Sequence, residues 1–287
     1  MVGERVLTAV QVAAGGVDAA TVDALRLAEG PYDLIVLPEI ANVPYFPIAP
    51  DLGEWLAGTL ADQDTESVFA PYRRLARRTG SYVVAGLCLP GPDRGRNAAV
   101  VFDRAGEVLP GRGVLSGDEV PAYDKTHLCN VRHYGSVFLE DQYFRPGSEL
   151  VVWDLDFARL GVLICYDRHF PEAWSTLRAN GVGIVAVPTA SPVGTAPTFL
   201  AEMQAMALQQ SVYAVVANRV GPESLPDGTT ADYLGRSAVL GPDGAVLNAA
   251  DRGSFEQASA PYDETRLDSV RAAMGLATSR RPALYQI

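Results

Sequence analysis

Short apolar runs rich in β-branched residues recur along the chain, and amphipathic helical patterns separate several of them. The strand-like runs lie at residues 5–12, 33–37, 82–87, 98–102, 161–164, 183–187, 213–217 and 237–240. The helical patterns lie at residues 17–28, 66–79, 173–179 and 198–211. This alternation predicts an α/β fold in which helices are layered on sheets.

The size and composition of the chain are those of a globular enzyme. With 287 residues, 48% of them hydrophobic, the chain can bury a substantial core. No compositional break or low-complexity linker interrupts it, so we expect one domain over residues 1–287. Its tail, residues 267–287, carries apolar side chains and is expected to dock on the body or on a partner subunit.

Charge and cysteine content narrow the class of protein further. A formal net charge of −11, from 34 acidic and 23 basic residues, argues against nucleic-acid binding, which needs basic patches. No apolar run approaches the roughly 18 residues of a membrane span, and no signal peptide is evident. The three cysteines are Cys88, Cys129 and Cys165. An odd number at wide spacing favours free thiols and predicts a cytoplasmic location.

Cys165 stands at a junction typical of a nucleophile. The apolar run that ends at Ile164 indicates a buried strand, and Pro171 opens a helical pattern soon afterwards. A thiol at this turn is exposed to the positive end of a helix dipole and to Arg168, and both favour the thiolate. The stretch by itself fits a buried core cysteine equally well.

Three charged residues elsewhere are candidates to act with Cys165. Glu39 follows an apolar strand and one proline, where partial burial makes a carboxylate a usable general base. Lys125 offers a fixed ammonium that can stabilise an oxyanion. Glu140 lies beside aromatic residues just before a Pro-Gly turn. Taken singly, each is more simply interpreted as a surface side chain.

Together, these contexts resemble the nitrilase superfamily of carbon–nitrogen hydrolases in residue type, order and spacing. The motifs are Leu37-Pro38-Glu39, Tyr123-Asp124-Lys125-Thr126-His127-Leu128 and Ile164-Cys165-Tyr166-Asp167-Arg168-His169-Phe170-Pro171-Glu172, supported by Glu140-x-x-Tyr143-Phe144-x-Pro146-Gly147, Met203-Gln204-Ala205 and Val216-Ala217-Asn218-Arg219. The resemblance runs from about Val6 to Tyr285. It implies a four-layer α-β-β-α sandwich with two mixed sheets, formed when two subunits pack their helical faces. The helices after Cys165 and at residues 198–211 would then make a homodimer.

The resemblance also implies a reaction, the hydrolysis of a non-peptide C–N bond in a small amide or ureido substrate. Glu39 would take the proton of Cys165, which attacks the carbonyl carbon. Lys125 and the backbone N–H of Tyr166 would hold the oxyanion. Glu39, with help from Glu140, would then position the hydrolytic water. No metal or organic cofactor is required.

Within the superfamily, the cysteine motif is most similar to N-carbamoyl amino acid amidohydrolases and β-ureidopropionases. In these proteins the arginine matching Arg168 meets the substrate carboxylate, a role that suits a planar guanidinium. His127 and His169 are expected to support substrate binding. D-carbamoylases carry Arg in place of His169 and His in place of Phe138, so a D-amino acid substrate is not implied.

Alternatives for the substrate follow from the same residues. Arg168 instead fits a structural ion pair with Asp167, Glu172 or another acid, and the substrate would then be an uncharged or cationic amide, such as one of the N-carbamoylputrescine type. The Cys-Trp-Glu sequence usual in nitrilases proper is absent, which disfavours a nitrile substrate.

Other classes of protein are compatible with parts of the pattern. Histidines at positions 127, 133 and 169, with Cys129, suggest a metal hydrolase, although their spacing matches no zinc pattern. A Cys–His dyad could use His133 or His169 as base. A non-catalytic interaction module is the remaining alternative, which the intact Glu39, Lys125 and Cys165 disfavour.

Overall fold

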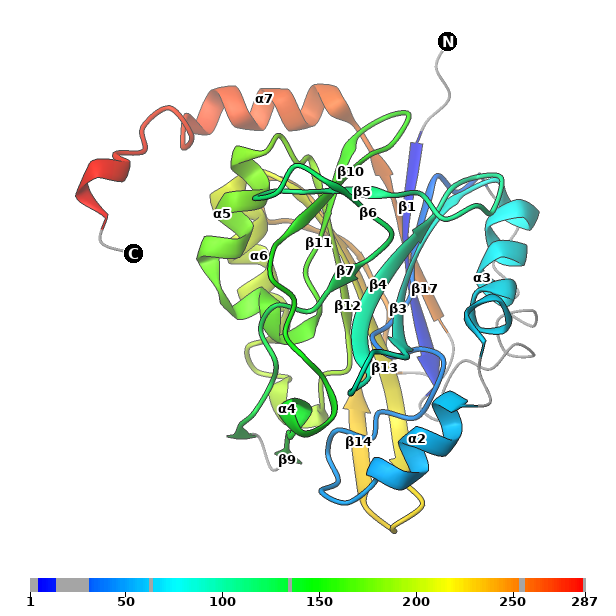
Figure 1. Cartoon of the computed structure of the whole chain (residues 1–287). Helices are drawn as coiled ribbons and strands as arrows, with labels where there is room; N and C mark the ends of the chain where they lie inside the picture. The colour runs from blue at the N-terminus through cyan, green and yellow to red at the C-terminus, as the bar shows by residue number, and fades with distance from the viewer. Residues whose placement is uncertain (1–4, 14–30, 62–63, 134–135, 253–255, 286–287) are drawn as a thin grey trace.

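The computed structural model describes residues 5–13, 31–61, 64–133, 136–252 and 256–285. The helix predicted at residues 17–28 lies outside these described residues. Each of the other predicted strands and helices is present with shifted boundaries, and the structure adds several short strands and helices that the sequence did not predict (Figure 1).

Two mixed sheets form the centre of the fold. The first contains, in spatial order, β17 (Glu256–Tyr262), β1 (Arg5–Ala13), β2 (Leu34–Val36), β3 (Tyr82–Leu89), β4 (Arg96–Phe102) and β7 (Tyr123–Asp124). The second contains β6 (Glu119–Val120), β5 (Gly111–Gly113), β10 (Val151–Asp154), β11 (Arg159–Val162), β12 (Ile184–Thr189), β13 (Tyr213–Ser224), β15 (Ala238–Leu240) and β16 (Val246–Ala249). The parallel strands β1–β2–β3 and β11–β12–β13 form the centre of each sheet.

The two sheets meet at one corner, where the end of β1 pairs with β13 in parallel. Beyond that corner β13 continues into a hairpin with β14 (Thr230–Leu234). A separate small hairpin joins β8 (Arg132–His133) and β9 (Ser136–Val137). The long strand β13 therefore connects both sheets to the loops at this end of the molecule.

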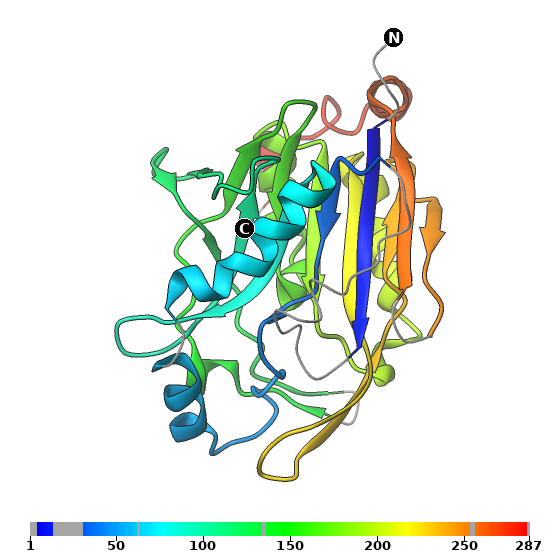
Figure 2. The ribbon, with the colours of Figure 1, turned by 90° about the vertical axis from the view of Figure 1, so that its right-hand side faces the viewer.

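Helices cover the outer faces of the two sheets. The α-helices are α2 (Gly53–Ala61), α3 (Thr65–Thr79), α4 (Glu140–Tyr143), α5 (Pro171–Ala179), α6 (Phe199–Gln210) and α7 (Glu264–Met274). The 3-10 helices are η1 (Cys165–His169), η2 (Val193–Thr195) and η3 (Pro282–Leu284). In Figure 1, α5 and α6 lie on one side of the strands, and α3 lies on the other side. Figure 2 shows α3 crossing the outer face of the first sheet.

The alternating faces of the central strands direct their side chains into a core between the sheets or into an outer core beneath the helices. Val84 and Ala186 point into the core between the sheets, whereas their neighbours Val83 and Val185 point outwards. Val83 packs in one core with residues of α3, such as Tyr72. Val185 packs in another core with residues of α5 and α6, such as Trp174.

All four layers of the α-β-β-α sandwich therefore lie within one chain. This confirms the predicted architecture but corrects the expectation that two subunits must pack together to form it. The physical reason is that each sheet is apolar on both faces. A sheet of this kind needs a partner on each side, and the chain supplies both partners itself.

The C-terminal tail begins with α7 and continues along the ends of the outer helices. Leu267 of α7 is buried, and Arg271 donates to the backbone carbonyl oxygens of Ser211 and Val182 at 3.2 and 2.8 Å. Farther along, Leu284 and Tyr285 are exposed.

Candidate active site

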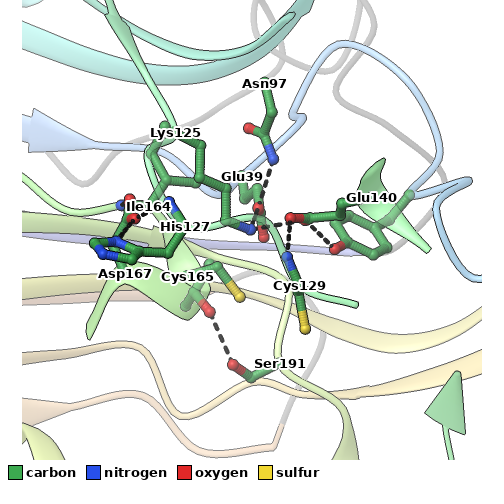
Figure 3. A network of polar contacts seen from close by, with 12 residues as sticks. Glu39, Asn97, Lys125, His127, Cys129, Glu140, Ile164, Cys165, Asp167 and Ser191 are labelled. Atoms are coloured by element: carbon green, nitrogen blue, oxygen red, sulfur yellow. Dashed lines mark hydrogen bonds and ion pairs between the residues drawn. The ribbon is translucent and has the colours of Figure 1, made fainter. Parts of the chain in front are cut away.

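The three predicted catalytic side chains lie at the ends of strands. Glu39 follows β2, Lys125 follows β7 directly, and Cys165 is the first residue of η1, after β11. Figure 3 shows the three side chains gathered at one place, with Glu140 beside them. The sequence motifs, which are far apart in the chain, therefore converge on one site.

Lys125 is the centre of this cluster. Its Nζ lies 2.7 Å from Oε1 of Glu39 and 2.7 Å from Oε1 of Glu140, and all three side chains are fully buried. Burial alone lowers the pKa of a lysine, but the charges of Glu140 and Glu39 raise the pKa of Lys125 well above its usual range. Lys125 is therefore a permanent cation. Two of its three N–H bonds are used by the carboxylates, which leaves one for a ligand.

Glu140, at the start of α4, accepts hydrogen bonds from two further donors. Its Oε1 accepts from the Tyr45 hydroxyl at 2.6 Å, and its Oε2 accepts from the backbone N–H of Cys129 at 2.7 Å. Burial raises its pKa to about 7, against the effect of Lys125 and with a further contribution from Glu39. The structure thus places a carboxyl group that titrates near neutral pH beside the lysine.

Cys165 has a strained backbone and a protonated thiol. Its φ angle is +47°, in the left-handed region that only glycine adopts without cost. Burial, followed by the charge of Glu39, raises the pKa of the thiol, although Lys125 and Arg168 act in the opposite direction. Arg168 thus favours the thiolate, as expected, but its effect is outweighed. The desolvation of the 7% exposed side chain outweighs the helix end and the nearby cations, so the thiol needs a base.

Asp167 holds the turn that carries Cys165. Its carboxylate accepts from the backbone N–H of Ile164 at 2.9 Å and from the Tyr123 hydroxyl at 2.8 Å. It also lies 2.8 Å from Nδ1 of His127 and accepts from the backbone N–H of the same residue at 2.9 Å. This carboxylate thus joins the cysteine turn to the lysine motif, a role that sequence reasoning missed.

Arg168 lies between the nucleophile and Glu202 of α6. It is 3% exposed, and its Nη1 lies 3.0 Å from the backbone oxygen and 3.6 Å from Sγ of Cys165. Its Nε lies 3.2 Å from Oε2 of Glu202. Of the ion pairs considered for Arg168, the structure therefore shows one with another acid, Glu202, in place of Asp167 or Glu172.

The two predicted substrate-binding histidines have structural contacts of their own. Nδ1 of His169 pairs with Oε1 of Glu202, so this acid joins two neighbouring residues of the cysteine motif. The ring of His127 stacks on Phe170, with 3.8 Å between centroids. Both histidines are partly exposed, and His169 is itself the last residue of η1.

The backbone at Glu39 approaches its neighbours closely. A Cβ atom added to Gly86 of β3 would lie 2.6 Å from the carbonyl oxygen of Pro38 and 2.8 Å from Cα of Glu39. Only glycine leaves room for this approach. The amide of Asn97, on the neighbouring strand β4, donates to Oε1 of Glu39 at 2.8 Å and orients the carboxylate. The other oxygen, Oε2, has no hydrogen-bond partner in the described part of the chain and is available to a ligand or to the thiol.

Sequence reasoning gave no role to Tyr45, Asn97, Glu202 or Glu223. Their positions carry no local signal, because each acts on a residue far away in the chain. Arg219 was noted only as part of a matching motif. It is fully buried and donates to the backbone oxygen of Glu39 at 3.1 Å.

Most of the chain is similar to a known protein family. The model of the carbon–nitrogen hydrolase family matches residues 5–272. The chain belongs to this family. A nitrilase from Pyrococcus abyssi is 31% identical over 80% of this chain and 76% of its own length. An N-carbamoylputrescine amidase from Arabidopsis thaliana is 31% identical over 60% of each chain.

The fold of this carbon–nitrogen hydrolase is shared with solved structures. The crystal structure of a carbon–nitrogen hydrolase from Helicobacter pylori G27 superposes with a TM-score of 0.81, at 22% identity, over 99% of this chain and 97% of that one. The nitrilase-type sandwich inferred from the motifs is thereby confirmed, as is an enzyme acting on C–N bonds other than peptide bonds.

Two further features of the described residues concern the other classes of protein. Within the described ranges, no three His, Cys, Asp or Glu side chains are grouped so that they could hold a metal ion. Among the helices described, none has the length and apolar character needed to cross a membrane.

Proposed function

We propose that this carbon–nitrogen hydrolase cleaves a small amide or ureido substrate through a covalent intermediate on Cys165. The observation that carries the proposal is the buried Lys125 ammonium, 2.7 Å from two carboxylates and beside a protonated thiol. A buried cation of this kind would stabilise negative charge on the carbonyl oxygen of the substrate. Because the site is dry, this stabilisation is strong.

In the first half of the reaction, Glu39 takes the proton of the Cys165 thiol as the sulfur attacks the carbonyl carbon. The carbonyl oxygen becomes an oxyanion, held by the free N–H of Lys125 and by the backbone N–H of Tyr166. The latter lies in the first turn of η1, where N–H groups lack intrahelical acceptors. Protonated Glu39 then gives its proton to the leaving nitrogen as the C–N bond breaks, and ammonia departs.

In the second half, a water replaces ammonia. Glu39, assisted by Glu140, takes a proton from this water as its oxygen attacks the thioester carbon. The C–S bond breaks and the proton returns to sulfur. A simple amide yields a carboxylic acid. A ureido substrate yields a carbamate, which breaks down to the amine and carbon dioxide.

For the substrate, we propose an N-carbamoyl amino acid whose carboxylate binds Arg168. The guanidinium group lies within 3.6 Å of the Cys165 sulfur, close enough for a ligand bound to it to reach the nucleophile. Glu202 already contacts the Nε side of this guanidinium, so a substrate carboxylate would bind on the other side or displace the acid.

A second candidate is an uncharged or cationic ureido compound or amide. The observation in its favour is the pairing of Arg168 with Glu202, because a neutralised guanidinium has less need of a substrate carboxylate. The similarity to an N-carbamoylputrescine amidase, whose name describes a cationic ureido substrate, also favours this class.

Ammonia release across a panel of substrates distinguishes these candidates. The panel contains N-carbamoyl amino acids, N-carbamoyl amines, simple amides and nitriles of matched size. Our first proposal predicts that carboxylate-bearing ureas react best and that Arg168→Ala removes this preference. If they react no better than neutral amides, the role of Arg168 as carboxylate binder is wrong.

A variant series tests the assignment of the base. Cys165→Ala and Glu39→Gln should abolish turnover, whereas His169→Ala and His133→Ala should retain it. A Cys–His dyad would give the opposite ranking of Glu39 and one of the histidines. Full activity after exhaustive chelation would exclude a metal hydrolase.

We also propose that the protein forms a homodimer through the outer face of α5 and α6 and acts in the cytoplasm. Met206 and Leu200 of α6 are only partly buried in the described chain, and the apolar Leu284 and Tyr285 of the tail are exposed. The three free cysteines are consistent with a reducing compartment. Light scattering of the purified protein tests the dimer.

A further inference from the structure

A cavity of about 280 Å³ lies beneath the C-terminal tail, away from the catalytic residues. The last residues of α5 and α6 and the segment that follows α7 enclose it. Its lining includes three arginines, Arg178, Arg271 and Arg280, together with the polar residues Gln210 and Ser211. Cys165, Lys125 and Glu39 are not part of this lining.

None of the three arginines is paired with a carboxylate in the described part of the chain. Among the described residues, Arg271 donates to the backbone oxygens of Ser211 and Val182. Arg280 donates to the Ser175 hydroxyl and to Oε1 of Gln210, both at 2.8 Å. For Arg178, the described residues offer neither a hydrogen bond nor an ion pair.

Several other arginines of the protein, in contrast, are paired with a carboxylate. Arg5, Arg96 and Arg266 each contact an aspartate at 2.8 Å or less. The chain as a whole has 34 acidic residues for 23 basic ones, so carboxylates are abundant. An unneutralised group of three cations in such a chain is therefore a local exception.

The three arginines act unfavourably on one another. Burial, and then the charge of Arg280, lower the pKa of Arg178. Burial, and then the charge of Arg178, lower the pKa of Arg271, although Asp268 acts in the opposite direction. Each of these effects disfavours the charged form of the arginine, and an anion in the cavity would act in the opposite direction.

The ends of α5 and α6 offset only part of this charge. A helix C-terminus carries about half a negative charge, so two such ends leave roughly two of the three positive charges uncompensated. An anion that entered the cavity would replace repulsion between guanidinium groups by several charge-assisted hydrogen bonds.

We propose that this cavity binds a small oxyanion of the phosphate or carboxylate class, held by Arg178, Arg271 and Arg280. The volume suits an anion of the size of phosphate or a short dicarboxylate. Arg178 supplies guanidinium N–H groups that no described residue uses. The site is separate from the catalytic cluster, so the proposal does not depend on the substrate assigned above.

Titration calorimetry with inorganic phosphate, and separately with succinate, tests the proposal at constant ionic strength. The variants are Arg178→Gln and, as matched control, Arg112→Gln, whose exposed side chain donates to one backbone oxygen outside the cavity. We expect one bound anion per chain and affinity weakened about tenfold or more in Arg178→Gln, with no change in the control. The anion that binds more tightly identifies the source class.

Thermal unfolding without added anion supplies a second readout. The substitution Arg178→Gln removes repulsion between guanidinium groups and breaks no hydrogen bond of the described chain. The variant should therefore melt at the same temperature as the wild type or at a higher one. A lower melting temperature would identify the arginine as a structural residue and overturn the proposal.

Three further outcomes would also overturn it. The absence of a calorimetric signal would show that the cavity takes up neither anion. Equal stabilisation of the wild type and Arg178→Gln by phosphate would indicate an adventitious ion only. A weakened subunit association in Arg178→Gln, without anion binding, would assign the arginines to a carboxylate on a second copy of the chain.

Discussion

Arg219 and Glu223 of β13 form a buried ion pair, with 3.1 Å between Nη1 and Oε1. The pair contacts the backbone of the loop that carries Glu39. Arg219 donates to the backbone oxygens of Glu39, Ile40 and Val43, and Glu223 accepts from the backbone N–H of Tyr45 at 3.0 Å. Ile40 has a φ angle of +50°, a strained value for a β-branched residue. The ion pair therefore holds Glu39, the proposed general base, in a loop that would otherwise relax.

Arg219→Lys tests this positioning role. A lysine can replace the charge but cannot reach the three carbonyl oxygens in the planar geometry of a guanidinium. We expect kcat to fall about 100-fold with KM nearly unchanged, because a displacement of about 1 Å misplaces the base without touching the substrate. The free energy of unfolding, measured in urea, should fall by about 3 kcal/mol.

The control for this experiment is Arg252→Lys, which alters an exposed pair with Asp232 and should change the free energy of unfolding by less than about 0.5 kcal/mol. If Arg219→Lys raises KM and leaves kcat intact, Arg219 acts on substrate binding and the positioning role is wrong.

The carboxyl group of Glu140 should determine how kcat/KM falls on the acidic side of its pH profile. Its pKa of about 7 predicts that kcat/KM falls as the pH drops through 7, when Glu140 becomes protonated. Glu140→Gln removes this titrating carboxyl group, so the fall in kcat/KM near pH 7 should disappear and kcat should fall about 10- to 100-fold. An unchanged fall in kcat/KM in the variant would assign the titration to another group.

The same pKa predicts a pH dependence of stability. Glu140 binds a proton more tightly in the folded protein than in the unfolded chain, where its pKa is about 4.5. Its stabilising contribution is thus complete below pH 4.5 and is lost as the pH rises through 7. Urea unfolding of the wild type and Glu140→Gln at pH 5 and pH 8 measures the difference, which should be larger at pH 5.

Alkylation measures the state of the Cys165 thiol. Because burial and Glu39 raise its pKa, the rate of labelling by iodoacetamide should keep rising above pH 9. Cys88 is fully buried, with a pKa raised by desolvation alone, so peptide mapping should find Cys165 labelled first. A rate that is already maximal at pH 7 would show a resting thiolate, and labelling without selectivity would revive the non-catalytic alternative.

Glu202 should control which substrates Arg168 accepts. Glu202→Gln leaves a neutral partner at the same place and frees the charge of the guanidinium. We expect kcat/KM to rise by severalfold for ureido acids relative to ureido amines of the same length. Glu172→Gln, which alters an exposed acid nearby, is the matched control. Equal effects on both substrate types would contradict a role of Arg168 in recognising a carboxylate.

The central strands of both sheets, the helices α3, α5 and α6 and the identity of the central site residues could be predicted from the sequence, whereas the short outer strands and the helices α2, α4 and α7 were not. Strands such as β3 and β12 are short apolar runs whose period is local, and the α3 pattern ends at Gly80, whose φ of +64° suits the end of a helix. Glu39 and Cys165 stand at strand ends, a placement that the local pattern also indicates, whereas the short strand before Lys125 was not predicted.

Only the tertiary structure decided the protonation and the partners of these groups. The distance of 2.7 Å from Lys125 to Glu39 joins residues 86 positions apart, and Glu202 reaches Arg168 from another helix. The pKa of a group depends on its burial and on the charges packed around it, and neither is a property of the local sequence. For this reason burial raises the pKa of the Cys165 thiol, an effect that the cysteine motif alone did not indicate.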